Sequence, residues 1–176
     1  MGNYAFTKGV SSGYLFEYSV FDTLRQFLKI PVRFIRNLKV YSIKLGKFTD
    51  IDLLIITQHK VYCVESKGFT SYLSGSINDK YWIGKSGKYE TEIFSPVIQN
   101  FEHVRSLNSN FRLINCEPLN AEPVICVKDK CHVKSDYDNI YTVTGLCLKI
   151  EQDSLRYEKI IDIEEVIDNI KRLGEF

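Results

Sequence analysis

The stretch DIDLLIITQHKVYCVESK, residues 50–67, contains two short apolar runs that are separated only by Gln58 and His59. Each run is rich in β-branched and aromatic residues, which is typical of β-strands. Two strands joined by so short a connection pair in antiparallel fashion, and both runs are apolar enough to lie inside a sheet. The stretch therefore predicts a hairpin of two interior strands.

The register of this hairpin decides what its polar residues can do. A tight turn centred on Gln58 and His59 sets Asp52 directly opposite Glu65, with Cβ atoms about 5 Å apart. Because side chains alternate between the faces of a strand, Lys67 shares the face of Glu65. Two opposed carboxylates repel each other unless a cation lies between them. The spacing therefore indicates a site that holds a divalent metal ion and activates a water beside it.

Two observations leave an alternative open. Gln-His is unusual in a two-residue turn, and a slip of one residue would turn Asp52 to the other face of the sheet. Asp52 and Glu65 would then be ordinary strand-end charges that face water, and Lys67 would form a surface ion pair of little energetic value. This interpretation explains Asp50 better than it explains Asp52.

The composition is that of an ordinary globular protein, and the 176 residues predict a single domain over 1–176. A net charge of +1 gives no overall attraction to nucleic acid, but residues 29–49 contain six bases and no acid. Five of these bases are predicted to contact nucleic-acid phosphates: Arg33, Arg36, Lys39, Lys44 and Lys47. The alternative is a basic loop and strand that face only water.

The five cysteines and the N-terminal residues bear on the compartment. An odd number of scattered cysteines in a chain whose first residues lack a hydrophobic signal core indicates free thiols in a reducing cytoplasm. No apolar run is long enough to span a membrane. We therefore expect a cytoplasmic protein with no membrane contact.

Three helices are predicted from apolar periodicity, over residues 12–29, from Ser95-Pro96 onward, and from Asp162 to the end. Glu17 lies on or beside the apolar stripe of the first helix, where a carboxylate is seldom buried without a partner or a metal. Gln99 and His103 share one face of the second helix, where either could reach a site or simply face water.

Further strands are predicted over residues 33–44, 123–127 and 139–144, and strands with turns at the rim of the sheet over 68–89. The last segment carries Tyr72, Tyr81 and Trp82. Such aromatic residues either stack on nucleotide bases or cover an edge of the sheet.

With these residues in place, the sequence resembles the NERD (nuclease-related domain) family of the P-D-(D/E)-x-K nuclease-like superfamily. Four blocks carry the resemblance, GYLFE at 13–17, TDID at 49–52, VYCVESK at 61–67 and SPVIQ at 95–99. The departures are Phe16 where a glycine is more usual, Asp50 in place of a glutamate, and Ser66 and Gly68 around Lys67. None of these departures removes a proposed ligand.

The resemblance implies an α/β fold with a central mixed β-sheet flanked by helices, as in a restriction-endonuclease-like core. It also implies a nuclease that acts on DNA, or alternatively on RNA. Asp52, Glu65 and the main-chain carbonyl of Ser66 would bind Mg²⁺ or Mn²⁺. Lys67 would orient the attacking water, Glu17 would bind a second metal ion or a water beside the first, and Gln99 would help to fix Lys67 or the substrate.

Two other functions are compatible with the sequence. A catalytically silent nuclease-like domain would bind nucleic acid or a protein partner, and a plain interaction domain would use the acids only as surface charges. The oligomeric state is open, and a homodimer is among the alternatives.

Overall fold

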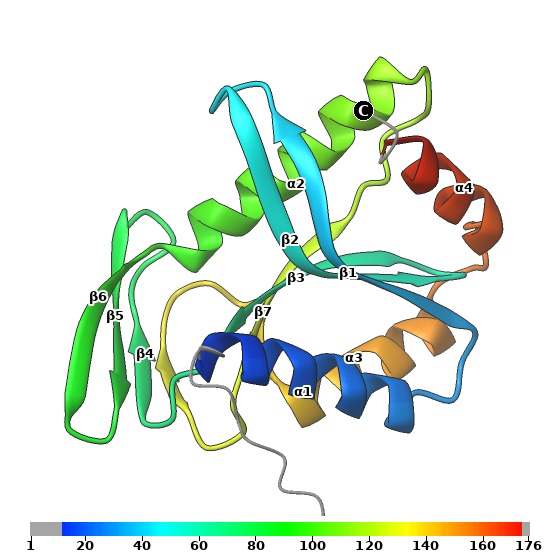
Figure 1. The fold of residues 1–176 in the computed structure, drawn as a ribbon. Coiled ribbons are helices and arrows are strands. Elements are labelled where there is room, and N and C mark those ends of the chain that lie inside the picture. The colour runs from blue at the N-terminus through cyan, green and yellow to red at the C-terminus, as the bar shows by residue number, and fades with distance from the viewer. Residues whose placement is uncertain (1–11, 174–176) are drawn as a thin grey trace, which may run out of the picture.

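The computed structural model describes residues 12–173, and the N-terminal residues 1–6 discussed above lie outside this range. A five-stranded sheet carries helices on both faces, and a four-stranded sheet stands beside one end of it (Figure 1). The elements follow one another as α1 (Ser12–Phe27), β1 (Val32–Ser42), β2 (Lys47–Thr57), β3 (Val61–Lys67), β4 (Tyr72–Ser74), β5 (Tyr81–Ser86), β6 (Tyr89–Phe94), α2 (Pro96–Leu113), β7 (Glu122–Val127), β8 (His132–Lys134), β9 (Ile140–Thr142), α3 (Val143–Arg156) and α4 (Ile163–Leu173).

The large sheet is mixed, in the order β1-β2-β3-β7-β9. The first three strands pair antiparallel, whereas β3, β7 and β9 run parallel. Helices α1 and α3 cover one face, and α2 and α4 cover the other (Figure 1). The predicted α/β fold, with a mixed sheet flanked by helices, is confirmed and is consistent with a restriction-endonuclease-like core.

The predicted hairpin is confirmed, including its register. The pairs run from Leu53 with Val64 to Ile56 with Val61, so Asp52 and Glu65 come next on the two strands. Thr57 makes the unusual Gln-His turn workable, because its hydroxyl accepts from the amides of both turn-closing residues, at 3.1 Å from His59 and 2.9 Å from Lys60.

The regular alternation of faces breaks once along β2, at Asp52. Ile51 and Leu54 both pack in the core under α2, whereas Leu53 packs in the core under α1. Directly across on β1, in the register set by the flanking pairs, Asn37 has a φ of 52°. A left-handed residue inside a strand re-aims the chain, so both strands change course beside Asp52.

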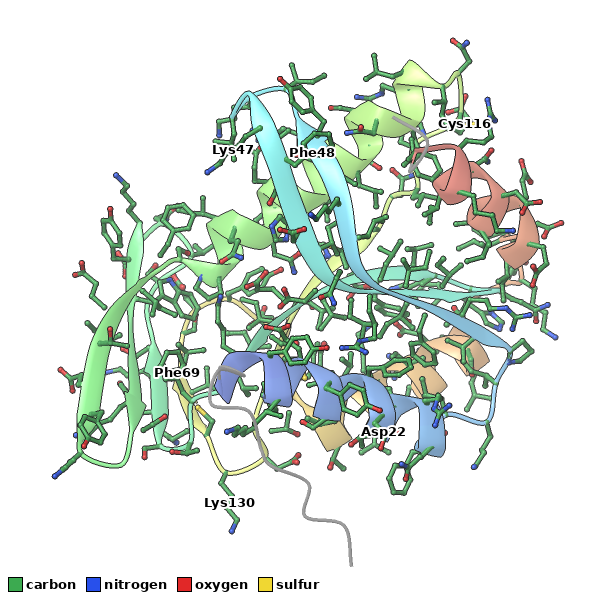
Figure 2. The ribbon with its side chains drawn as sticks, in the orientation of Figure 1. Asp22, Lys47, Phe48, Phe69, Cys116 and Lys130 are labelled. Atoms are coloured by element: carbon green, nitrogen blue, oxygen red, sulfur yellow. The ribbon has the colours of Figure 1, made fainter. Side chains whose placement is uncertain are left out.

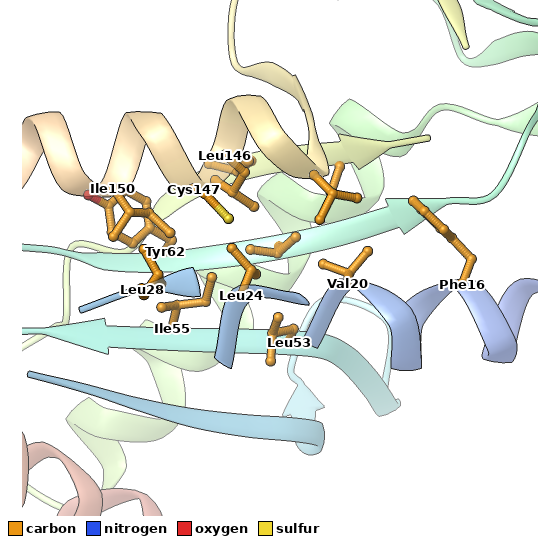
Figure 3. Packing of buried hydrophobic residues seen from close by; sticks show 14 residues of the cluster. Phe16, Val20, Leu24, Leu28, Leu53, Ile55, Tyr62, Leu146, Cys147 and Ile150 are labelled. Carbon is orange, nitrogen blue, oxygen red and sulfur yellow. The ribbon is translucent and has the colours of Figure 1, made fainter. Parts of the chain in front are cut away.

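Three cores hold the described residues together. On the α1 side, Val20 and Leu24 point from α1 onto Leu53 and Ile55, with residues of α3 alongside (Figure 3). The core under α2 lies on the opposite face of the same strands. The third core, which contains Trp82, joins the small sheet to the large one.

Two predictions about elements are wrong in part. The segment 139–144 is a strand only as far as Thr142, whose hydroxyl then accepts from the amide of Gly145 at 3.0 Å and caps the unpredicted helix α3. Residues 68–89 form strands, but these belong to the separate small sheet and not to the rim of the large one. The three predicted helices are present as α1, α2 and α4.

The five cysteines are free, as predicted, and all except the half-buried Cys116 are buried. Within residues 12–173, none of the helices combines the length and the apolar character needed to cross a membrane.

Candidate metal centre

The candidate site lies where β3 ends, beside the first turns of α2. Asp52 comes from β2, Glu65 and Lys67 come from β3, and Gln99 comes from α2. Helix α2 is fixed at this point because the Ser95 hydroxyl accepts from the amide of Ile98 at 3.4 Å and Pro96 begins the helix.

Lys67 is held by two residues. Its ammonium donates to Glu65 Oε1 at 2.6 Å and to Gln99 Oε1 at 3.2 Å. Gln99, which is 32 positions from Lys67 in the sequence, therefore helps to fix this lysine in the structure. Its role in a reaction stays a prediction.

Asp52 lies against the backbone of β3, where its Oδ2 accepts from the Ser66 amide at 2.8 Å. The pKa of Asp52 is raised to about 8. Burial is the largest cause, and the negative charges of Glu65 and Glu17 add to it, whereas the hydrogen bond from the Ser66 amide lowers the pKa. A carboxylate whose proton is held this strongly is one that a cation would stabilise in the charged form.

Glu65 is almost completely buried, with only 2% of its side chain exposed. Burial raises its pKa, against the opposing charge of Lys67. Its second oxygen, Oε2, has no hydrogen-bond partner among residues 12–173. A buried carboxylate oxygen without a partner is costly, so this atom is the strongest sign that the site is built for a further ligand.

His103 lies deeper along α2, with its Nδ1 at 3.5 Å from Glu65 Oε2. Burial and the charge of Lys67 lower the pKa of His103 to about 4, so the imidazole is neutral at pH 7. The only sequence feature that indicated a role for His103 in the site was its spacing of four residues from Gln99.

Asn100 was not singled out from the sequence, yet it fastens α2 to the sheet. Its amide donates to the carbonyls of Cys63 and Val124, each at 2.9 Å, and so bridges β3 and β7. A polar residue in a helix gives no sign of such a role before the fold is known.

Glu17 is half-buried on α1 and close enough to raise the pKa of both Asp52 and Glu65. Even so, within the part of the chain that the structure describes, no three His, Cys, Asp or Glu residues form a group that could hold a metal ion. Any ion would therefore need ligands beyond the carboxylates of Asp52 and Glu65, such as main-chain carbonyls and water.

Residues 12–128 match the model of a known protein family, described as nuclease-related domain, or NERD. The chain belongs to the NERD family. The matched range contains all four of the sequence blocks that carried the resemblance. A comparison with curated proteins finds no match.

The donor set of this NERD domain fits a hard divalent cation. It offers carboxylate oxygens on two adjacent strands, and one of these oxygens is buried and unpartnered. Mg²⁺ and Mn²⁺ prefer oxygen ligands of this kind. Whether the four predicted ligands, Asp52, Glu65, Ser66 and Glu17, bind an ion stays a prediction.

Two of the predicted phosphate contacts already have partners among the described residues. Arg33 pairs with Glu164 at 2.9 Å, near the start of β1, where it lies across from Ile56 of β2. The guanidinium of Arg36 lies over the ring of Tyr18, 4.9 Å from its centroid, on the α1 side of the sheet.

The other three predicted contacts lie on the projecting hairpin of β1 and β2. Lys39 and Lys47 are exposed, and Lys47 lies at the tip of this hairpin (Figure 2). Lys44 pairs with Glu102 of α2 at 3.3 Å. The five bases are thus spread along one hairpin, and their binding to nucleic acid stays a prediction.

Proposed function

We propose that this NERD-family protein is a nuclease that depends on a divalent metal ion, Mg²⁺ or Mn²⁺, and hydrolyses phosphodiester bonds of DNA. The observation that carries the proposal is the buried Oε2 of Glu65, which has no hydrogen-bond partner among the described residues, on a side chain whose other oxygen, Oε1, accepts from Lys67. A domain that used these acids only as surface charges would not bury them together.

In this proposal Asp52, Glu65 and the main-chain carbonyl of Ser66 hold the ion, and Glu17 contributes to a second ion or to a water. A divalent cation bound there supplies Lewis acidity and a template for in-line attack on the phosphodiester. Asp52 must give up its proton for the ion to bind, because only the carboxylate is a good ligand.

Lys67 acts next to the ion. Its ammonium is fixed by Glu65 and Gln99, so it has one direction left in which to donate. From there it orients the attacking water and offsets negative charge on the phosphate. The neutral imidazole of His103 adds no charge to compete with the cation.

The bases on the hairpin of β1 and β2 would hold the DNA backbone through its phosphates, which positions the substrate without reading its sequence. The free thiols support the cytoplasm as the location of the protein.

One observation favours a second function, a catalytically silent domain that binds nucleic acid or a protein partner. Lys67 already compensates the charge of Glu65 at 2.6 Å. A NERD domain that had lost activity could keep this ion pair as a structural contact. The two functions differ in whether the bound substrate is cut.

The test is cleavage of a supercoiled plasmid and of labelled oligonucleotides with Mg²⁺, with Mn²⁺, and with EDTA. The nuclease proposal predicts cleavage only with metal, and a loss of at least about 100-fold in rate for Glu65→Gln and for Lys67→Met. The matched controls are the exposed residues of the loop before α4, Glu158→Gln and Lys159→Met, which should cut like wild type.

Calorimetry with Mn²⁺ separates the roles of the two residues. Glu65→Gln should lose both metal binding and cleavage, whereas Lys67→Met should lose cleavage and keep the metal. If wild type cuts nothing with any metal, or if both variants cut as well as wild type, the catalytic proposal is wrong.

A further inference from the structure

The small sheet, in the order β6-β5-β4-β8, has one face that covers the third core and one that does not. Leu73 and Trp82 point inward and are completely buried. Because side chains alternate, Tyr72 and Tyr81 point to the opposite face. The side chains of this outer face are therefore not part of the third core.

Aromatic rings gather on the outer face in two pairs. Tyr81 lies across from Phe94, with ring centroids 6.2 Å apart, and these side chains are 48% and 44% exposed. Tyr72 lies across from His132, with ring centroids 5.9 Å apart and planes within 16° of parallel. Tyr72 is half-buried, and the other three rings are exposed. Several exposed rings on one sheet face are unusual unless something covers them.

Lysines accompany these rings. The Lys80 ammonium lies 5.3 Å from the centroid of the Tyr81 ring, Lys85 is paired in register with Tyr72, and Lys134 lies on the neighbouring strand β8. None of the three forms an ion pair with a described residue, in contrast to Lys44, which pairs with a carboxylate. The acids in the strands of this sheet lie on its edge strand β6, where Glu90 is paired in register with Lys85.

We infer that this outer face binds a single-stranded polynucleotide, whose bases stack on the Tyr81–Phe94 and Tyr72–His132 pairs and whose phosphates contact Lys80, Lys85 and Lys134. Stacking on exposed aromatic rings beside unpaired cations is how proteins hold single strands without reading their sequence. In a duplex each base face is covered by its neighbours, so these rings would find nothing to stack on.

The connections of the small sheet place the sheet beside the candidate metal centre. Phe94 is followed directly by Ser95, which caps the helix that carries Gln99. At the other end, only residues 68–71 separate Lys67 from β4. Figure 1 shows the small sheet beside the end of the large one where β3 ends and α2 begins.

The inference rests on the proposed function only in that the strand held here would be the substrate to be cut. Binding itself requires no metal. It is therefore measured in EDTA, where no cleavage interferes, by fluorescence anisotropy of labelled dT20 and rU20, with a labelled 20-base-pair duplex as the comparison.

Wild type should bind the single strands at least about tenfold more tightly than the duplex at the same salt concentration. The double variant Tyr81→Ala/Phe94→Ala should weaken single-strand binding by about tenfold or more. Phe27→Ala, which removes a ring that is 62% exposed at the end of α1, is the matched control and should bind like wild type. Lys85→Gln/Lys134→Gln should reduce the salt dependence of binding.

Preference for the duplex, or an equal loss with Phe27→Ala, would overturn the inference. So would unchanged single-strand binding in the Tyr81→Ala/Phe94→Ala variant with its thermal unfolding intact. If that variant fails to fold, Tyr81→Leu/Phe94→Leu keeps the apolar bulk without the ring and gives the same readout. The nuclease proposal is tested separately, since Glu65→Gln should bind single strands normally while it fails to cut.

Discussion

Asp52 shows how burial acts on the proton of a single carboxylate. Burial, followed by the charges of Glu65 and Glu17, raises its pKa to about 8. Because the folded state then holds a proton that the unfolded state releases near pH 4, the free energy of unfolding falls as the pH rises from about 4 to 8 in the absence of metal.

This gives a prediction about metal and pH. Mn²⁺ must displace the proton of Asp52, so the rise in melting temperature on adding Mn²⁺ should be several degrees at pH 8 and much smaller at pH 6. Thermal unfolding with and without Mn²⁺ at both values is the measurement. Asp52→Asn should abolish the difference, and an equal Mn²⁺ effect at both pH values in wild type would contradict the prediction.

The residues that the sequence could supply were those with a pattern. Asp52, Glu65 and Lys67 followed from the two-residue period of strands, and Gln99 from its place after the Ser95-Pro96 helix start. The burial of Glu65 Oε2 without a hydrogen-bond partner, and its place 3.5 Å from His103 Nδ1, depend on packing between distant segments. No local sequence pattern indicates either feature.

At the scale of elements, the bend in β1 and β2 matters most. Asn37 has a φ of 52° directly across from Asp52, where the alternation of faces breaks. Asparagine tolerates the left-handed region better than most residues with a Cβ, and glycine tolerates it best. The bend thus depends on the residue type at this position.

Asn37→Val should lower the free energy of unfolding by about 1–2 kcal/mol, because a β-branched residue is strained in the left-handed region. It should also weaken Mn²⁺ binding, because a change in the bend of β1 and β2 would shift the Asp52 side chain away from Glu65. Asn37→Gly should match or exceed wild type in both. Urea unfolding and calorimetry are the measurements, with Lys39→Val, at an exposed position two residues further along β1, as the matched control. Equal stability of the valine and glycine variants would argue against strain at this position.

The prediction of helices and strands succeeded where the apolar pattern repeats over many residues and failed where the segment is short. Helices α1, α2 and α4 and the central hairpin follow from their apolar spacing. The strand β9 has only the residues Ile140–Thr142, and the helix α3 begins at once. A strand of three residues that runs directly into a helix cannot be told from a longer strand by periodicity alone.

At the scale of the whole molecule, a second polar cluster joins distant segments at the other end of β3 from the candidate site. Asp153 of α3 accepts from Lys149 and, at 2.8 Å, from the hydroxyl of Tyr62. Lys60, beside the hairpin turn, pairs with Asp153 at 3.4 Å and with Glu122 of β7 at 2.7 Å. The cluster ties the hairpin, β7 and α3 together.

Burial alone would raise the pKa of Asp153, but the hydrogen bonds from Lys149 and Tyr62 hold it below its ordinary value. A lowered folded-state pKa stabilises the protein above about pH 4 and loses this effect as the pH falls through the folded-state value. Asp153→Asn should therefore cost about 2 kcal/mol of unfolding free energy at pH 7 and much less at pH 3.

Urea unfolding at both pH values measures this difference. Asp168→Asn, which breaks the exposed pair with Lys171, is the control and should change stability little. A loss in the Asp153→Asn variant that stayed the same at pH 3 would show that the charge of Asp153 is not the cause.

The order of the strands was the part of the whole fold that no local pattern could give. The parallel neighbours β3 and β7 are separated in the sequence by α2 and by three of the four strands of the small sheet, β4, β5 and β6. Only the family resemblance implied a mixed sheet. The separation of the small sheet went unpredicted, because alternation shows that a segment is a strand without showing which sheet it joins.

In the proposed function, Asp52 and Glu65 hold a divalent cation. The most direct measurement is anomalous diffraction from a crystal soaked in Mn²⁺ at pH 8. We predict an anomalous peak about 2.0–2.3 Å from a carboxylate oxygen of each residue, with Glu65 Oε2 among the ligands. If the anomalous signal of the data is strong, no peak lies there and Lys67 is still paired with Glu65, the proposed metal site is wrong.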